Sequence, residues 1–325
     1  MQPTIFPLAL LTLTIAFGLT GPLGGRLPPV AIAQAFPAQA PGPGEKASPD
    51  QTATQVTPSP GGIALSKGNW VYYLAPSGNQ PRKLVQGLQP ALSPDGKKLV
   101  YGLERKDLGG CFGLMVLDLA TGQTATLLPP LPKRTDDPAW SPRGDLLAFI
   151  YNREINIIRP DGSGRQKIFT MPSQWNLTPQ WASDGKSLFI SDLFHLFQID
   201  LAGQELAKTP LTTFTGGEIA VSSADLFLLN PQTPQLWAFT GEVEGTSGHT
   251  NPLFLFDTRT QKRTRLTPAD MSAYRPCWSR DGQYLYFLGS RGPRYSRREY
   301  PAQFYRLNRD GTGLTELGKG QKSSQ

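Results

Sequence analysis

The stretch PAWSPRGDLLAFIY, residues 138–151, decides the fold because its pattern recurs along the chain. Each copy has a proline, one further residue, a tryptophan or leucine, a polar turn that ends in glycine, and an apolar run. Related copies are PALSPDGKKLVYG at 90–102, PQWASDGKSLFIS at 179–191, PCWSRDGQYLYFLG at 276–289 and, more weakly, LLNPQTPQLWAFTG at 228–241. Such internal similarity predicts a repeat architecture.

The spacing of the copies indicates which architecture. We call the tryptophan-or-leucine position the slot, and it is occupied by Leu92, Trp140, Trp181, Leu229 and Trp278. Successive slots are 48, 41, 48 and 49 residues apart. This matches the roughly 40–50 residues of one β-propeller blade. The regular recurrence of a bulky residue predicts that the slots pack between blades rather than stack on a ligand.

The remainder of each unit predicts two further strands. Alternating apolar residues, a turn and a second β-prone run are strong hairpin signals. They occur at 114–128, 155–169, 196–211, 253–267 and 304–317. Residues 63–85 resemble a shorter unit of about three strands, aligned with the third and fourth strands of the others. The sequence therefore predicts an all-β, six-bladed β-propeller of four-stranded blades, with five or seven blades as alternatives.

Composition agrees with a turn-rich chain. The 325 residues include 34 Gly and 31 Pro, which excludes a long helical bundle or coiled coil. The formal net charge is +7, which permits contact with acidic protein surfaces, lipid head groups or glycans. The basic residues are scattered, whereas nucleic-acid-binding proteins gather them on one face. We therefore expect no nucleic-acid partner.

The N-terminus has the features of an export signal. Residues 5–19, IFPLALLTLTIAFGL, form an uncharged apolar run that is short for a membrane span but suits a secretory signal. Ala31-Ile32-Ala33 has the A-x-A form of a cleavage site, so we expect residues 1–33 to be a signal peptide cut before Gln34. Because no Lys or Arg precedes the run, an uncleaved N-terminal anchor is the alternative.

Three further segments complete the predicted domain organisation. Residues 34–62 are rich in Pro, Ala and Gln without apolar periodicity, which is typical of a disordered linker. The propeller is predicted over 63–317, and residues 318–325 are a polar tail.

The repeats resemble the Pro-Asp-Gly propeller units of the TolB family, loosely P-x-W-S-P-D-G-x-x-L followed by an apolar strand. The resemblance covers residues 63–317, and its motif is specific for architecture rather than for activity. It implies an exported, periplasmic six-bladed propeller that binds protein partners of the cell envelope and lacks catalysis. TolB proteins also carry an α/β domain before the propeller, whereas the first 62 residues here have the composition of a signal and a linker.

Few residues could carry chemistry. His195 and His249 are the only histidines, and we interpret them as a half-buried strand residue and an exposed loop residue. Cys111 and Cys277 are the only cysteines, and we expect free thiols that behave as small core residues. No metal-ligand spacing, nucleophile elbow or phosphate loop is present. The sequence therefore predicts no enzyme, no metal site and no cofactor.

One loop stands out as a candidate binding surface. The segment SRGPRYSRREYPAQFYR, residues 290–306, interleaves Arg and Tyr between the second and third strands of the last blade. These two residue types are enriched at binding hot spots. The candidate partner-binding residues are Arg291, Arg294, Tyr295, Arg297, Arg298, Tyr300 and Tyr305. An acidic insertion at 241–252 occupies the same place in the preceding blade, so we expect both loops on one face.

These observations favour an exported, monomeric TolB-like propeller that acts as a non-enzymatic protein-binding module in the periplasm, the cell envelope or outside the cell. Its expected partner is a protein of the cell envelope, including one with an acidic surface, and no stable membrane span remains after signal cleavage. One alternative is a carbohydrate-binding or glycan-modifying propeller that uses the channel mouth. Another is a structural role in a larger assembly.

Overall fold

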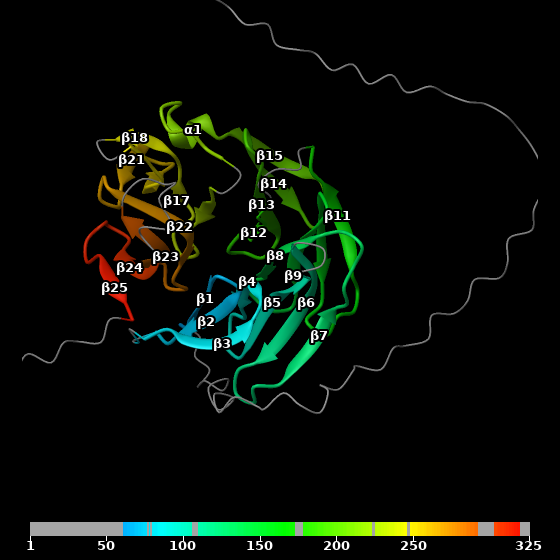
Figure 1. The fold of residues 1–325 in the computed structure, drawn as a ribbon. Coiled ribbons are helices and arrows are strands. Elements are labelled where there is room, and N and C mark those ends of the chain that lie inside the picture. The colour runs from blue at the N-terminus through cyan, green and yellow to red at the C-terminus, as the bar shows by residue number, and fades with distance from the viewer. Residues whose placement is uncertain are drawn as a thin grey trace, which may run out of the picture. The chain divides into compact units, whose positions relative to one another are not determined.

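Among the described residues, six antiparallel sheets of three or four strands follow one another around a common centre (Figure 1). The structure is a computed structural model, and it describes residues 61–76, 78, 80–105, 110–172, 178–222, 225–245, 248–291 and 302–318. All of these residues belong to one compact unit, Ser48–Gln325. Each sheet is one blade of a β-propeller, and we number the blades in chain order.

The strands of the first three blades are as follows. Blade 1 contains β1 (Ile63–Lys67), β2 (Trp70–Leu74) and β3 (Arg82–Gln86). Blade 2 contains β4 (Leu88–Leu92), β5 (Lys98–Arg105), β6 (Gly110–Asp118) and β7 (Thr124–Leu128). Blade 3 contains β8 (Thr135–Trp140), β9 (Leu147–Tyr151), β10 (Glu154–Ile158) and β11 (Gln166–Thr170).

The other three blades have four strands each. Blade 4 contains β12 (Gln180–Trp181), β13 (Ser187–Ser191), β14 (His195–Asp200) and β15 (Glu205–Pro210). Blade 5 contains β16 (Phe227–Leu229), β17 (Leu236–Thr240), β20 (Leu253–Asp257) and β21 (Lys262–Arg265). Blade 6 contains β22 (Met271–Trp278), β23 (Tyr284–Arg291), β24 (Gln303–Asn308) and β25 (Thr315–Leu317). A short helix, α1 (Thr212–Thr215), connects blades 4 and 5, and β18 (Val243–Gly245) pairs with β19 (Gly248–Thr250) inside blade 5.

The repeated turn joins the first and second strands of a blade through a serine hydroxyl. In blade 2, Ser93 Oγ donates to Asp95 Oδ1 at 2.6 Å and accepts the Lys98 backbone N–H at 2.9 Å. Gly96 has a φ of +72°, a left-handed conformation that glycine adopts without steric cost. Blade 6 repeats the arrangement, because Ser279 Oγ donates to Asp281 Oδ1 at 2.6 Å. The Ser-Pro-Asp-Gly pattern thus closes a hairpin locally, before any long-range contact forms.

Apolar clusters between neighbouring blades hold the ring together. Six such clusters exist in the described part of the chain, one for each pair of neighbouring blades. The cluster that joins the last blade to the first contains Ile63 and Leu65 from β1 together with Tyr286, Phe304 and Leu317 from blade 6. Among the described residues, therefore, the ring closes by side-chain packing rather than by a strand that the two end blades share.

The predicted fold is confirmed in its main features. The chain is a six-bladed propeller, and blade 1, from the short unit at 63–85, has three described strands where the other blades have four. No helix within the described ranges is long and apolar enough to cross a membrane. The signal peptide at 1–33 and the linker through residue 60 lie outside the described residues, as do residues 319–325.

Candidate functional site

The slot tryptophans join the innermost strands of successive blades. Trp140 Nε1 donates to the Ala91 carbonyl at 3.0 Å, and Trp181 Nε1 donates to the Ala139 carbonyl at 3.0 Å. Trp278 repeats the contact, and its Nε1 lies 3.1 Å from the carbonyl oxygen of the preceding blade's β16. Each indole also packs with the apolar cluster between its own blade and the blade before it. The sequence interpretation of the slots as interblade packing residues is therefore confirmed.

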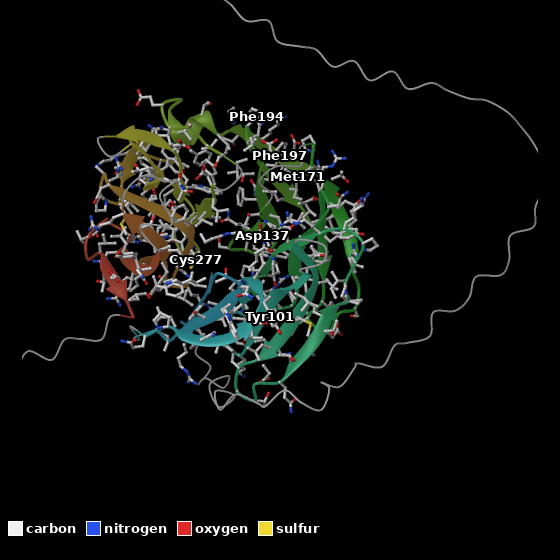
Figure 2. The ribbon with its side chains drawn as sticks, in the orientation of Figure 1. Tyr101, Asp137, Met171, Phe194, Phe197 and Cys277 are labelled. Atoms are coloured by element: carbon white, nitrogen blue, oxygen red, sulfur yellow. The ribbon has the colours of Figure 1, made fainter. Side chains whose placement is uncertain are left out.

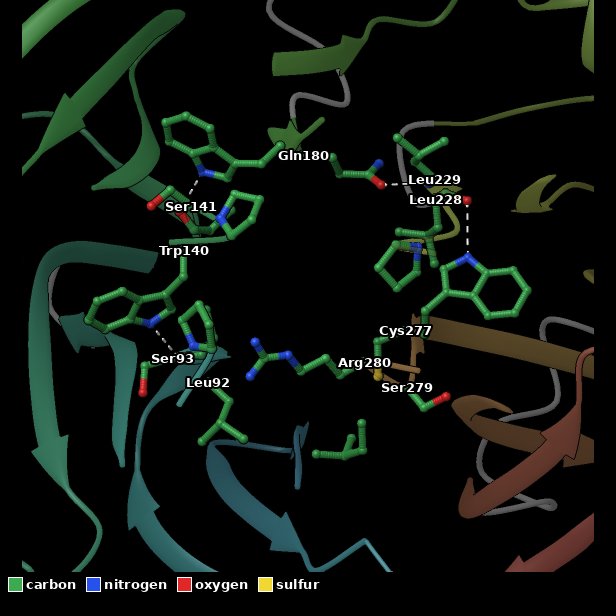
Figure 3. Close-up of a pocket in the computed structure, with 18 of the residues that line it drawn as sticks. Leu92, Ser93, Trp140, Ser141, Gln180, Leu228, Leu229, Cys277, Ser279 and Arg280 are labelled. Carbon is green, nitrogen blue, oxygen red and sulfur yellow. Dashed lines mark hydrogen bonds between the residues drawn. The ribbon is translucent and has the colours of Figure 1, made fainter. Parts of the chain in front are cut away.

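In blade 5, where the slot holds Leu229, a glutamine side chain makes the link between innermost strands. Leu229 has no indole to offer, and its backbone N–H donates instead to Gln180 Oε1 at 2.9 Å. The same amide donates from Nε2 to the Phe227 carbonyl. Both contacts join β12 to β16, and Figure 3 shows the one between Gln180 and Leu229. The innermost strands of blades 4 and 5 are therefore linked although blade 5 has no tryptophan in its slot.

A cavity opens at the end of the ring where the turns between the first and second strands of the blades lie. We call it the mouth cavity. It has a volume of about 550 Å³. Its wall consists of slot residues, of the Ser-Pro turns that follow them, and of β1. These include Trp140, Trp181, Trp278, Pro94, Pro142 and Ile63. Apart from Arg280, the described residues of the wall are uncharged, and many are apolar, which is typical of a binding pocket with few polar groups that fix orientation.

Arg280 is the single charged residue of the mouth cavity among the described residues that line it. Its side chain is exposed and extends toward the middle of the cavity (Figure 3). It also lines an adjoining cavity of about 610 Å³ with Asp281, Tyr284 and Tyr286. Arg280 stands two residues after its slot, at the position that Pro94 and Pro142 occupy in other blades. The site therefore offers one guanidinium to an anionic group of a ligand.

At the other end of the same strands, polar side chains converge into what we call the girdle. Gln89, Asp137 and Arg275 stand three residues before their slots, and their φ angles are +51°, +47° and +50°. Each lies at a register shift between the first and second strands of its blade. Such bulges change the direction in which a side chain points. All three residues line a small cavity of about 140 Å³, together with Thr178.

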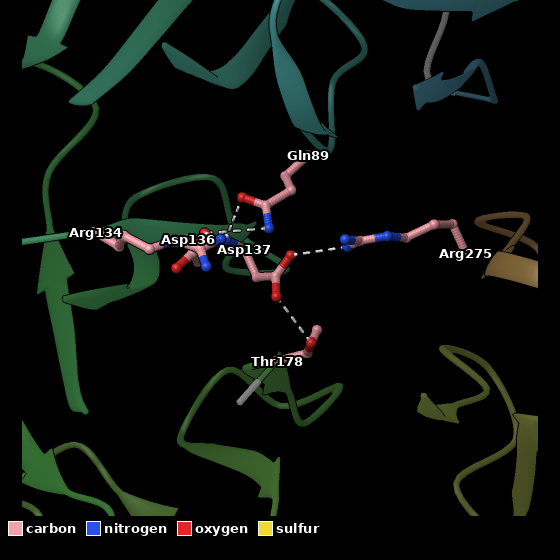
Figure 4. A network of polar contacts seen from close by, with 6 residues as sticks. All are labelled: Gln89, Arg134, Asp136, Asp137, Thr178 and Arg275. Atoms are coloured by element: carbon pink, nitrogen blue, oxygen red, sulfur yellow. Dashed lines mark hydrogen bonds and ion pairs between the residues drawn. The ribbon is translucent and has the colours of Figure 1, made fainter. Parts of the chain in front are cut away.

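The girdle residues bond one another across the ring (Figure 4). Arg275 Nη1 lies 3.3 Å from Asp137 Oδ1, although the residues belong to blades 6 and 3. Thr178 Oγ1 donates to Asp137 Oδ2 at 3.1 Å, and the Asp137 backbone N–H donates to Gln89 Oε1 at 3.1 Å. Asp136 accepts from Gln89 Nε2 at 3.4 Å. These contacts connect blades 2, 3, 4 and 6 at the girdle end of the ring.

Burial dominates the electrostatics of the girdle. It raises the pKa of Asp137 above its usual value, while the charge of Arg275 and the Thr178 hydroxyl oppose the shift. Asp136 raises the pKa of Asp137 further by its negative charge. The Asp137 carboxyl therefore keeps its proton to a higher pH than an ordinary aspartate does. It lies near the centre of the ring, as does Cys277, whereas the exposed Phe194 lies at the rim (Figure 2).

The girdle residues and Arg280 were not among the residues predicted from the sequence. The signal was present, because each occupies a fixed offset from a slot, three residues before it or two residues after it. The contact itself depends on closure of the ring, which brings Asp137 next to Arg275, 138 positions away in the sequence, and no local pattern predicts it.

The predicted partner-binding residues lie in three kinds of place. Arg291 is exposed at the end of β23, and its Nη1 lies 2.8 Å from Asp270 Oδ2. Tyr305 is buried, stacks on Phe287 and bonds Glu316 through its hydroxyl. It belongs to the core between blades 5 and 6. The others fall outside the described residues: Arg294, Tyr295, Arg297, Arg298 and Tyr300.

The insertions at 241–252 and 291–302 both follow the second strand of a blade, β17 and β23. Second strands run antiparallel to first strands, so both insertions begin at the girdle end. The mouth cavity lies at the opposite end. The first insertion contains the β18–β19 hairpin rather than an open loop, and His249 lies on β19.

His195 and Cys277, which the sequence singled out as chemically reactive types, lie in a strand and in the cavity walls. His195 is a half-buried residue of β14, and its Nδ1 lies 3.8 Å from Asp192 Oδ1. Cys277 is a free cysteine that lines both the mouth cavity and the girdle cavity. Burial raises its pKa to about 12. The described ranges contain no group of three or more His, Cys, Asp or Glu side chains that could hold a metal ion.

Comparison with known proteins identifies the fold. No family model matches the sequence, and no curated protein matches it. Among solved structures, TolB from Acinetobacter baumannii is similar, with a TM-score of 0.61 and 19% identity over 79% of this chain and 63% of that one. Putative TolB from Agrobacterium tumefaciens has a TM-score of 0.56 and 20% identity over 74% of this chain and 84% of that one. A chain of a nidogen/laminin complex has a TM-score of 0.53 and 10% identity, with coverages of 78% and 92%.

The likeness confirms a TolB-like β-propeller fold. This chain spans less than two thirds of the length of the Acinetobacter protein. At such low identity the comparison establishes architecture alone, because a shared fold does not determine function.

Proposed function

We propose that this chain is an exported, non-enzymatic propeller that binds a protein partner of the cell envelope through its mouth cavity. The observation that carries the proposal is the composition of this cavity. Among the described residues that line it, uncharged groups that include indole, proline and serine side chains surround one guanidinium, that of Arg280. A protruding loop or extended segment of a partner, with an acidic side chain at its tip, matches both the apolar wall and the charge.

The indole groups favour a protein segment over a glycan. A sugar-binding tryptophan offers an open face of its indole to the sugar ring that stacks on it, whereas the slot tryptophans pack with the apolar clusters between blades. Here the Nε1 atoms of Trp140, Trp181 and Trp278 are all committed to backbone carbonyls of the preceding blade. The carbohydrate alternative therefore finds less support in the mouth cavity than the protein one.

Photo-cross-linking in cells tests the proposal. A photoreactive residue replaces Gln232, which lines both the mouth cavity and the adjoining cavity. We expect it to capture a discrete protein, and Arg280→Glu should weaken the capture by about tenfold or more, because it places two like charges together. The control is Arg259→Glu, an exposed residue in the turn between the last two strands of blade 5. Equal capture by the two variants would contradict the assignment of Arg280.

We propose the Arg- and Tyr-rich segment between β23 and β24 as a second contact surface, because Arg291, at its start, lies at the girdle end of the ring, opposite the mouth cavity. Deleting residues 293–301 tests it, because the deletion spares Arg291 with its ion pair and leaves Tyr305 in the core. If the loop binds the partner, the deletion lowers capture while the melting temperature stays unchanged. If capture is also unchanged, this surface is eliminated and the mouth cavity stands alone.

Export is part of the proposal, with residues 1–33 as a cleaved signal and the mature protein a monomer in the periplasm or outside the cell. Cell fractionation and mass spectrometry of the purified protein test it. We expect the mature N-terminus at Gln34. An intact N-terminus in the membrane fraction would show the anchored alternative instead.

A further inference from the structure

The connection between blades 2 and 3 is a proline-rich segment, residues 129–134, with the sequence PPLPKR. It follows β7 and precedes β8, so it lies at the girdle end of the ring, where a fourth strand is joined to the next first strand. Gly87 alone makes the same connection between blades 1 and 2. Closure of the ring therefore does not explain the length or the composition of this segment.

The prolines impose a polyproline II conformation on the segment. Each proline has its φ fixed at about −65°, and each residue that precedes a proline is restricted to extended conformations. Leu128 and Leu131 both pack in the apolar cluster between blades 2 and 3, and their spacing of three residues matches the polyproline II period of about three. The backbone bends only after them, at Pro132 and Lys133. The two leucines therefore face the core, and the prolines face outward.

The outward sides of the segment are accessible to a partner. Pro129, Pro130, Pro132 and Lys133 are exposed. Among the described residues, no backbone–backbone hydrogen bond uses a carbonyl oxygen of residues 129–133. Backbone carbonyls are strong hydrogen-bond acceptors. Exposed pyrrolidine rings and open carbonyls are the features that aromatic-lined grooves of polyproline-binding domains recognise.

The segment is held in place at both ends. Gly113 of β6 lies close behind its start, because a Cβ at this glycine would be 2.8 Å from the Leu128 carbonyl oxygen. At its other end, the Arg134 carbonyl accepts the Asn152 backbone N–H at 3.0 Å. The Arg134 guanidinium lies 3.0 Å from Asp136 Oδ1. A segment that is already ordered loses little conformational entropy when a partner binds.

Positive charge adjoins the prolines. Lys133 is exposed, and the Arg134 side chain is 59% exposed. Arg153 is also exposed, and it follows Asn152, whose N–H is bonded to the Arg134 carbonyl. A surface that receives the prolines is therefore complementary when it carries carboxylates.

We propose that residues 129–134 are a docking segment for a protein domain whose groove is lined with aromatic side chains and bordered by carboxylates. The prolines insert between the aromatic rings, and the open carbonyls accept hydrogen bonds from Trp or Tyr side chains. Lys133 and Arg134 pair with the carboxylates. This site is independent of the mouth cavity and lies at the opposite end of the ring, so one chain can connect two partners.

Binding of a purified polyproline-binding domain tests whether the fold presents the segment. The probe is an SH3 or WW domain selected on a synthetic peptide of residues 127–135 that carries Leu128→Ala and Leu131→Ala. These substitutions ensure that the probe does not depend on the two side chains that pack inward. By isothermal titration calorimetry, we expect the folded chain to bind the probe at least as tightly as the peptide does. Weaker binding than that of the peptide would overturn the proposal.

Matched proline variants locate the contact. Pro129→Ala combined with Pro132→Ala should weaken probe binding by about tenfold or more, because it removes two rings on one side of the helix and its preorganisation. The control is Pro210→Ala combined with Pro234→Ala, which removes two exposed prolines elsewhere. Thermal unfolding verifies that both double variants are folded. Equal affinity of the two for the probe would contradict the assignment of the prolines.

Charge reversal tests the border of the groove. Lys133→Glu should weaken probe binding by about tenfold, because it places like charges together. Arg259→Glu makes the same change at an exposed residue of blade 5 and should leave the affinity unchanged. Equal affinities of the two variants would overturn the pairing with carboxylates.

Photo-cross-linking from Arg153 in cells tests the natural partner and separates this site from the mouth cavity. We expect the captured protein, once purified, to be displaced from the chain by the peptide of residues 127–135, and its capture to persist in Arg280→Glu. Absence of capture, or a captured protein that the peptide does not displace, would overturn the proposal. Loss of capture at Gln232 alone would count only against the mouth cavity.

Discussion

The backbone N–H of Leu229 donates to the side chain of Gln180 at 2.9 Å, across the boundary between blades 4 and 5. In blades 3, 4 and 6 the equivalent link is an indole N–H donated to a backbone carbonyl of the preceding blade, as from Trp140 to Ala91. Two different residue pairs therefore meet the same structural demand. In blades 2 and 3 the residue before the slot is alanine, and in blade 4 it is Gln180, which reaches forward to the slot of the next blade.

This exchange predicts a compensating double mutant. Gln180→Ala removes both bonds to β16 and should lower the free energy of unfolding by about 1–3 kcal/mol. Adding Leu229→Trp recreates the combination of Ala139 and Trp181, so most of the loss should be recovered. Urea unfolding of both single variants and of the double variant measures the coupling. Purely additive losses would show that the two devices are not equivalent.

A second prediction concerns two glycines at the same place in the repeat. Gly185 and Gly282 have φ angles of +69° and +67°, so alanine at either position costs about 1 kcal/mol in backbone strain. A Cβ at Gly185 would meet nothing closer than 3.6 Å, whereas at Gly282 it would collide with the amide of Asn230. That amide donates to the Gly282 carbonyl at 2.9 Å and links blades 5 and 6.

Gly282→Ala should therefore destabilise the protein by about 1–2 kcal/mol more than Gly185→Ala, because it adds the loss of an interblade hydrogen bond to the same strain. Thermal unfolding of the two variants measures the difference, which corresponds to about 2–6 °C in a domain of this size. Equal melting temperatures would mean that Asn230 moves aside without cost.

The repeat was predictable because its causes are local. The Ser-Pro-Asp-Gly turn closes through Ser93, Asp95 and Gly96 within six residues. Because the residues that form the turn are neighbours in the sequence, the pattern alone predicts the hairpin. The blade count followed from the slot spacing for the same reason. The short first unit was also recognisable, because it aligned with the third and fourth strands of the other units.

The candidate site was harder to predict because it depends on ring closure. Asp137 and Arg275 are aimed inward by bulges, and no local pattern distinguishes a bulge in a strand from regular pairing. Tyr305 shows the converse difficulty. Composition grouped it with the arginines of the loop, but its place on β24, paired with Phe287, puts its ring in the core.

Asp137 in the girdle should make the folded protein more stable at acid pH than at neutral pH, which is opposite to the usual effect of a carboxylate in an ion pair. Because burial raises the pKa of Asp137 in the folded protein, the native state holds this proton more tightly than the unfolded state. Stability from this group is then lost as the pH rises from about 3.8 through the raised value. The free-energy difference between the wild type and Asp137→Asn should accordingly fall with rising pH, as measured by urea unfolding between about pH 3.5 and 7.

Asp161 provides a control of opposite sign. Hydrogen bonds from Ser163 lower the pKa of this exposed carboxyl, so the difference between the wild type and Asp161→Asn should rise with pH over the acid range. Arg275→Met tests the pairing, because loss of the cation should raise the pKa of Asp137 further and extend its titration to higher pH. A girdle difference that rises with pH would show that Arg275 outweighs burial.

The last prediction concerns the thiol in the channel wall. Burial raises the pKa of Cys277 from 9.0 to about 12, and the thiolate is the species that reacts with alkylating agents. At pH 8 the thiolate fraction falls by about a thousandfold relative to an ordinary cysteine. In a Cys111→Ser variant, where Cys277 is the one thiol left, alkylation by iodoacetamide should be about a thousandfold slower in the folded protein than in guanidinium chloride. Because Cys277 lines the mouth cavity beside Trp278, rapid labelling of the folded protein would mean that water solvates the cavity wall far better than the packing of these residues implies.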